Sequence, residues 1–110
     1  MTYREFWLVY LRAHNRPGTR VLHYFGSLTA LILLICAVAL FDWRLLIAAV
    51  VVGYACAWLG HVVVERNRPA TFGHPAWSLI SDYRMLVLWF GGRLGAHLAR
   101  SRGDDANRSI

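Results

Sequence analysis

The sequence has no lysine, no internal repeat and no low-complexity tract, and it contains just two cysteines. With 110 residues and no repeat, the chain can form one domain at most and is too short for a large water-soluble core. Cys36 and Cys56 fall in two apolar blocks at depths that differ by about 9 Å along a helix axis, which excludes a disulfide within one hairpin. They are interpreted as small apolar filling residues, and they carry no information about the redox compartment.

Formal charge is absent from two long blocks, Val21 to Phe41 and Leu45 to Val64. Hydrophobic residues make up 57% of the chain and are concentrated there. A bilayer core of ~30 Å needs about 20 apolar residues at ~1.5 Å per residue, so each block is long enough to cross. Because Asp42, Trp43 and Arg44 alone separate the blocks, the sequence predicts a tight hairpin of two transmembrane helices.

The positive charge is arranged around these blocks. The net charge is +6, and all 12 basic residues are arginines because lysine is absent. One of them, Arg44, is at the hairpin tip, and the others precede the first block or follow the second. The positive-inside rule therefore predicts an integral membrane protein with both termini in the cytoplasm. Arginines that flank spans meet anionic headgroups, so the expected partner is the lipid bilayer and not nucleic acid.

The segments outside the blocks are predicted to be helical. Residues Tyr3 to His14 place apolar side chains at helical spacing opposite charged ones, which is typical of a helix in the headgroup plane. A second helix is predicted over 77–91, along the interface or packed on the hairpin, after a loop at 70–75. The predicted fold is an all-α membrane protein: a two-helix transmembrane hairpin with amphipathic interfacial helices on the cytoplasmic side. Its single domain covers residues 1–100, and residues 101–110 are predicted to form a disordered tail.

Four of the five histidines are predicted to lie at one end of the hairpin: His14, His23, His61 and His74. His23 begins the first span and His61 ends the second, at depths only ~3 Å apart. An imidazole at a membrane boundary needs polar partners, and a shared iron, zinc, copper or nickel ion would satisfy four together. In the alternative, each histidine is an interfacial amphiphile that bonds backbone or lipid phosphate. His97 has no clear partner and is left out of the predicted site.

Small residues indicate which faces of the two spans meet. A stripe of them runs along each span from its histidine, and small side chains let membrane helices pack closely. The stripes are Gly26, Ala30 and Ala37 on the first span, and Ala57, Gly53 and Ala49 on the second. His23 and His61 are therefore expected to point toward each other and away from lipid.

Charged residues beside these histidines are further site candidates. Glu65 follows His61 by one helical turn, so it could act as a ligand, as a catalytic carboxylate or as the acceptor that orients an imidazole N–H. Asp82 is a weaker candidate for the last role. Arg66 and Arg68 either anchor the end of the span to headgroups or bind a substrate carboxylate through their guanidinium groups.

Several stretches of the sequence resemble the Mpo1-like (DUF962) family of 2-hydroxy fatty acid dioxygenases. The first runs from Tyr10–His14 through Leu22–Gly26 and carries two of the histidines. The second is Trp58–Ala70, in which a Gly-His pair is followed by a glutamate and a Pro-Ala pair at fixed spacing. With His74–Leu79, which looks typical of short bacterial members, the resemblance covers residues 6–90.

The resemblance implies a non-haem Fe(II) dioxygenase that cleaves 2-hydroxy fatty acids with O₂ in lipid α-oxidation, in the bacterial inner membrane. It implies His14, His23 and His61 as iron ligands and places Glu65 in the site. Another divalent transition metal, a metal- or haem-binding membrane protein without oxygenase activity, and a structural membrane adaptor are the alternatives. A homodimer is compatible with the sequence because two spans alone bury little surface.

Overall fold

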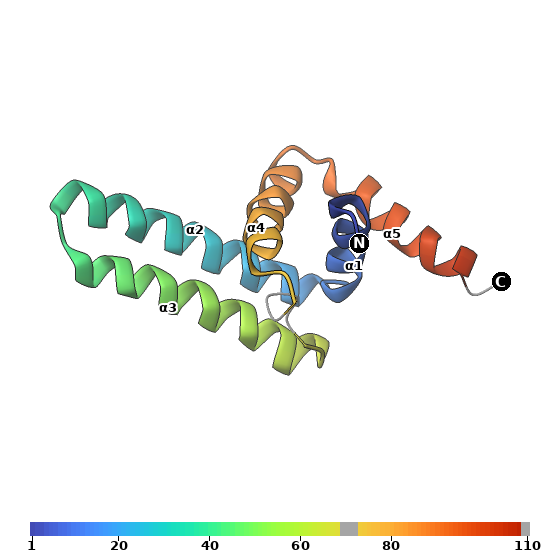
Figure 1. The fold of residues 1–110 in the computed structure, drawn as a ribbon, viewed down its shortest axis with the longest axis horizontal. Coiled ribbons are helices and arrows are strands. Elements are labelled where there is room, and N and C mark those ends of the chain that lie inside the picture. The colour runs from blue at the N-terminus through green and yellow to red at the C-terminus, as the bar shows by residue number, and fades with distance from the viewer. Residues whose placement is uncertain (69–72, 109–110) are drawn as a thin grey trace.

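The computed structural model describes residues 1–68 and 73–108. These residues form five α-helices and one π-helical turn in an elongated molecule of 55 × 27 × 26 Å (Figure 1). Two long helices form a packed pair, and the other three gather at one end of it. In chain order the elements are α1 (Tyr3–Ala13), α2 (Pro17–Leu40), α3 (Trp43–Leu59), η1 (Gly60–Glu65), α4 (Pro75–Phe90) and α5 (Leu94–Arg108).

The turn between α2 and α3 is short because the residues at the helix ends suit it. Phe41 adopts the left-handed conformation, with φ of 52°, and so ends α2. Asp42 caps α3 by accepting a hydrogen bond from the backbone N–H of Arg44 at 3.0 Å. The predicted hairpin is confirmed as a packed pair. Both Pro17–Leu40 and Trp43–Glu65 are long and apolar enough to cross a membrane.

The small-residue stripes form the contact between α2 and α3, as predicted. A Cβ atom added to Gly26 would lie 2.7 Å from Cβ of Cys56, a distance that leaves room for glycine alone. Farther along, a Cβ added to Gly53 would lie 3.5 Å from that of Ala30, which is ordinary van der Waals contact. Cys36 and Cys56 are both free, so the prediction of no disulfide is confirmed.

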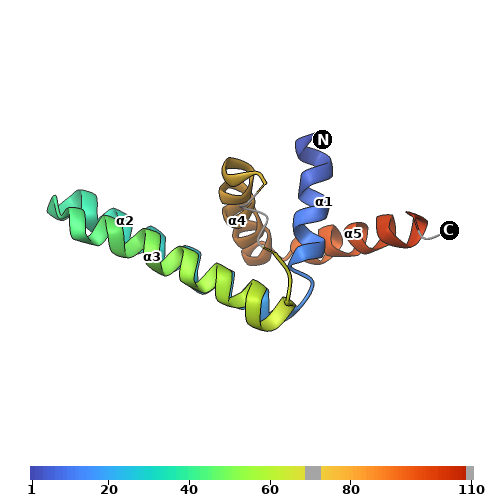
Figure 2. The same ribbon diagram turned by 60° about the horizontal axis from the view of Figure 1, so that its bottom comes forward.

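Helices α1, α4 and α5 pack around an aromatic-rich core beside the start of α2 (Figure 2). Helix α1 starts at Thr2, whose hydroxyl accepts a hydrogen bond from the N–H of Glu5 at 3.2 Å. Its apolar side faces the other helices of the protein. The core consists of Phe6, Trp7, Tyr10, Leu11, Tyr24, Met85, Leu86, Leu94 and Leu98.

The last two helices differ from the prediction at their ends. Helix α4 begins at Pro75, where a proline suits the first turn. Helix α5 continues to Arg108, where a disordered tail had been expected from residue 101. At the start of this stretch Ser101 is buried, and its carbonyl accepts a hydrogen bond from Arg12 of α1. Residues 70–72 of the predicted loop and 109–110 of the predicted tail lie outside the described residues.

Candidate metal centre

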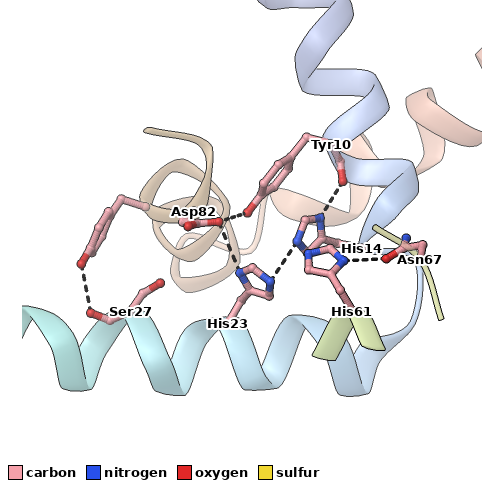
Figure 3. Close-up of polar contacts among 8 residues, drawn as sticks. Tyr10, His14, His23, Ser27, His61, Asn67 and Asp82 are labelled. Carbon is pink, nitrogen blue, oxygen red and sulfur yellow. Dashed lines mark hydrogen bonds and ion pairs between the residues drawn. The ribbon is translucent and has the colours of Figure 1, made fainter. Parts of the chain in front are cut away.

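Three histidine rings from three different segments meet where the hairpin joins the other helices (Figure 3). His14 follows α1, His23 lies in the first turns of α2, and His61 lies in η1. Their side chains are 0%, 5% and 2% exposed, so water has little access to the rings. One nitrogen of each ring lies within 4.8 Å of the corresponding nitrogens of the other two. The structure thus brings together three of the four histidines predicted to share a metal ion.

His14 is held at the centre of this cluster by both of its ring nitrogens. Its Nδ1 lies 2.6 Å from the carbonyl oxygen of Tyr10, one helical turn earlier, and its Nε2 lies 3.0 Å from Nε2 of His23. A carbonyl can only accept, so Nδ1 carries the proton. Burial, together with the neighbouring His23 and His61, lowers the pKa of His14 well below its usual range. The ring is therefore a neutral imidazole, the form that binds a metal.

His23 is oriented by a carboxylate from α4. Its Nδ1 lies 3.3 Å from Oδ1 of Asp82, and the hydroxyl of Tyr10 donates a short hydrogen bond to the same oxygen. Burial and the adjacent carboxylate raise the pKa of Tyr10 well above its usual range, so its hydroxyl keeps the proton that it donates. Asp82, the weaker of the two predicted acceptors, is thus the one that contacts a cluster histidine.

His61 is oriented by Asn67, which the sequence analysis did not single out. Its Nδ1 lies 2.7 Å from Oδ1 of Asn67, whose Nδ2 donates to the carbonyl of Ala13 at 3.0 Å. Because the Ala13 carbonyl accepts from the amide nitrogen, the amide oxygen is the atom that faces His61. Nδ1 of His61 is then the protonated nitrogen, and Nε2 has the free lone pair.

The π-helical turn makes this contact with Asn67 possible. In a continued α-helix, a residue six positions after His61 would lie roughly 240° around the axis and about 9 Å farther along it. Here the turn ends at Arg66, which has φ of 59°, and the N–H groups of Arg66 and Asn67 both donate to the His61 carbonyl. The chain folds back, and the Asn67 side chain reaches the ring. Such π-turns are frequent at functional sites.

The three rings share one pattern that fits a metal ion. Each Nδ1 faces a protein oxygen, the arrangement that orients metal-binding histidines. The Nε2 atoms of His14 and His23 share a hydrogen bond, and its proton would have to leave for both nitrogens to bind an ion. Two nitrogens bound to one ion at about 2.0–2.1 Å stand roughly 3.0–3.4 Å apart. The hydrogen-bonded pair of His14 and His23 has this spacing at 3.0 Å, and the three nitrogens together lie within 4.8 Å of one another. An all-imidazole set suits iron, zinc, copper or nickel, and it does not suit magnesium or calcium.

His74 and Glu65, two further predicted site residues, lie outside this cluster. His74 is exposed before α4, where its ring stacks on Trp77 at 4.8 Å between centroids and meets Phe6 edge-on. The Glu65 carboxylate accepts a hydrogen bond from the backbone N–H of Arg16, at the start of α2. The one-turn spacing from His61 assumed an α-helix, and the π-helical turn changes which face Glu65 occupies.

Arg66 and Arg68, the predicted substrate-binding residues, are exposed, and neither lines the cavity at the histidines. Their role in binding a carboxylate stays a prediction. His97 does have a partner: its Nδ1 accepts a hydrogen bond from Nε1 of Trp7 at 3.1 Å, away from the three histidines. No sequence signal indicated Asn67 as a site residue, because its contact depends on the unpredicted turn.

A cavity of about 460 Å³ opens beside the cluster and continues between α2, α3 and α4. Its polar end contains the three histidines, Tyr10 and Asp82, and the rest of its wall is mostly apolar. Its lining residues are Tyr10, His14, His23, Ser27, Ala30, Leu34, Leu46, Ala49, Val50, Gly53, Tyr54, Ala57, His61, Pro75, Ser78, Leu79, Asp82 and Tyr83. The site therefore combines potential metal ligands with space for an apolar molecule.

A family described as 2-hydroxy-palmitic acid dioxygenase Mpo1-like has a model that matches residues 1–94 of the chain. The matched range contains all three clustered histidines, Asn67 and Asp82. No curated protein and no solved structure matches the chain.

Proposed function

Because the chain belongs to the Mpo1-like family, we propose that it is a membrane-embedded, non-haem Fe(II) dioxygenase that cleaves 2-hydroxy fatty acids. The observation that carries this proposal is the buried cluster of His14, His23 and His61 at the polar end of an apolar cavity. The family description supplies the reaction class, and the cluster and the cavity supply a place for the metal and the substrate.

Integration in a membrane is supported by the exposed apolar surface of the hairpin. Only 22% of the most apolar part of α2 and 17% of that of α3 with η1 are buried within the protein. A core helix of a soluble protein is mostly buried, whereas a helix in lipid leaves its apolar side chains facing outward. Because all the arginines except Arg44 precede the first span or follow the second, the proposed location is a bacterial inner membrane with both termini in the cytoplasm.

The proposed metal ligands are the Nε2 atoms of His14, His23 and His61. A ferrous ion bound there would supply the electrons and the open coordination position that O₂ chemistry requires. Overall, one 2-hydroxy acid and one O₂ give the acid one carbon shorter, CO₂ and water, so the reaction needs no further reductant. Another divalent transition metal in the same ligands is the alternative for the metal alone.

In this proposal, residues around the three histidines orient the imidazole rings for metal binding. The Tyr10 carbonyl, Asp82 and Asn67 each face the Nδ1 of one histidine and would orient its Nε2 toward the ion. The hydroxyl of Tyr10 keeps its proton and fixes the Asp82 carboxylate. Glu65 holds η1 to the start of α2, and through that contact it would position His61. The proposed ligand set does not include His74, which lies outside the cluster, and a catalytic role for Glu65 stays a prediction.

The proposed reaction is tested by aerobic incubation of Fe(II)-loaded protein, in phospholipid nanodiscs, with 2-hydroxypalmitic acid. We expect pentadecanoic acid and CO₂ to form in equal amounts, and palmitic acid without the 2-hydroxyl to remain unchanged. The His61→Ala variant should form neither product. Wild-type protein that holds iron but leaves the 2-hydroxy acid intact would instead support a metal-binding protein without oxygenase activity, and a Soret band would indicate haem.

A further inference from the structure

The cavity follows the hairpin away from the three histidines, along the contact between α2 and α3. We propose that it holds the acyl chain of a single-chain 2-hydroxy acid along the hairpin, with the headgroup at the histidines. The side chains at positions 46 and 49, at the far end, then set the longest chain that fits. This inference rests on the proposed function, since it assigns the substrate of that same site.

The length of the cavity fits one extended acyl chain. At ~1.5 Å per residue, Leu34 lies about 16 Å along α2 from His23, and Leu46 lies about 22 Å along α3 and η1 from His61. One leaflet of a bilayer has acyl chains that fill about half of a ~30 Å hydrocarbon core. The cavity is therefore about as long as a leaflet is deep, and its volume of about 460 Å³ falls in the usual range for small-molecule sites. Along the hairpin it is a groove open to one side, because Leu34, Leu46 and Val50 are exposed.

At the histidine end of the cavity, a buried hydroxyl without a hydrogen-bond partner indicates a place for a ligand. The hydroxyl of Ser78 is buried, with the residue 3% exposed, and it has no hydrogen-bond partner among the described residues. Ser78 lines the cavity one helical turn before Asp82, on the same face of α4. Leaving a buried hydroxyl unpaired costs about 1–3 kcal/mol, so a ligand oxygen bound here would recover that cost.

The charge of the lining also fits this orientation. Among its described lining residues, the cavity has one carboxylate, Asp82, and no arginine. A free carboxylate could not bind stably in the apolar part, because a buried charge needs a partner. Because Asp82 would repel a second carboxylate, the headgroup needs the bound metal ion as its partner and belongs beside the metal ligands and the hydroxyl of Ser78. That leaves the apolar length between α2 and α3 for the chain.

The residues at the far end of the cavity would limit the length of the acyl chain that fits. Ala49 is 5% exposed and about 18 Å along the helix from His61, so a larger side chain there fills the end of the cavity. Leu46 lies one turn farther, and removing its side chain deepens the cavity. Ala49→Leu should then favour shorter acids and Leu46→Ala longer ones.

Photolabelling locates the chain directly and needs no turnover. Two analogues of 2-hydroxypalmitic acid carry a diazirine, one near the headgroup and one at the terminal carbon, and labelled residues are identified by peptide mass spectrometry of protein in nanodiscs. We expect the first to label the wall near Ser27, Ala57 and Leu79, and the second to label Leu34, Leu46 or Val50. Equal labelling of Ile32 and Ile47, which are exposed residues outside the cavity, would overturn the proposal.

Competition by 2-hydroxy acids of increasing length then tests whether positions 46 and 49 set the preferred chain length. In Ala49→Leu an overlong chain should meet the larger side chain, so 2-hydroxystearic acid should lose roughly tenfold as a competitor relative to 2-hydroxylauric acid. Leu46→Ala should shift the preference in the opposite direction, which keeps the test valid if Ala49→Leu fails to fold. The matched controls Ala55→Leu and Ile47→Ala change exposed side chains outside the cavity and should leave the preference unchanged.

Different results would refute the dioxygenase proposal and the acyl-chain proposal. Labels confined to the cavity without any shortened product would refute the dioxygenase and keep the acyl-chain proposal. Product formation with an unchanged length preference in both Ala49→Leu and Leu46→Ala would keep the dioxygenase and refute the acyl-chain proposal.

Discussion

Replacing Asn67 by alanine should weaken metal binding without touching a ligand. The substitution removes the oxygen 2.7 Å from Nδ1 of His61 and the amide that donates to Ala13 at 3.0 Å. Without its acceptor, the imidazole can rotate or change tautomer, and loss of such a partner typically lowers metal affinity about 10–100-fold. The two lost hydrogen bonds should also lower the free energy of unfolding by about 1–3 kcal/mol.

Asn67→Asp separates these two effects. The aspartate keeps an oxygen toward His61 but cannot donate to the Ala13 carbonyl, so we expect it to retain iron better than Asn67→Ala while still losing stability. Iron affinity is measured by competition with a chromophoric chelator, and stability by thermal unfolding of the metal-free protein. Asn15→Ala, which removes an exposed side chain that accepts a hydrogen bond from Arg102, serves as the control for iron affinity. Wild-type iron affinity in Asn67→Ala would refute the orienting role of this residue.

Three further predictions concern the contacts around the site. Asp82→Ala should lower iron affinity about 10–100-fold in the chelator competition. Tyr10→Phe should lower it less, because the Asp82 carboxylate still faces His23. The control Tyr3→Phe removes a hydroxyl that bonds Ser81 and should leave the iron affinity unchanged. Gly26→Ala should lower the thermal stability by about 1–3 kcal/mol because its Cβ would meet Cys56, and Cys56→Gly should restore it, whereas Gly53→Ala should be tolerated. Burial, with Arg84 and Arg100 nearby, lowers the pKa of His97, so the folded state binds a proton less readily than the unfolded state. Stability should therefore decrease as the pH falls from about 6.5 through the folded pKa, and thermal unfolding of His97→Gln should show a weaker decrease; an equal decrease would contradict this assignment.

The sequence allowed the hairpin and the centre of the site to be predicted, because both depend on spacing along regular helices. The uncharged blocks define α2 and α3, and counting residues from the tip brings His23 and His61 to one level. The small residues then indicate the facing sides, as the contact between Ala30 and Gly53 confirms.

The orienting contacts could not be predicted in this way, because they depend on irregular backbone and on packing between distant segments. The π-helical turn removes Glu65 from the face that an α-helix would give it and brings Asn67 to His61. Asp82 meets His23 only because α4 packs beside α2, and nothing in the local sequence specifies that contact.

Metal analysis of the purified protein and its single histidine variants tests the three-histidine centre most directly. Wild type should hold about one iron per chain, and His14→Ala, His23→Ala and His61→Ala should each lose it. His74→Ala and His97→Ala, which change histidines outside the cluster, should keep it. Wild-type protein without any transition metal, or undiminished iron in His61→Ala, would contradict the metal centre.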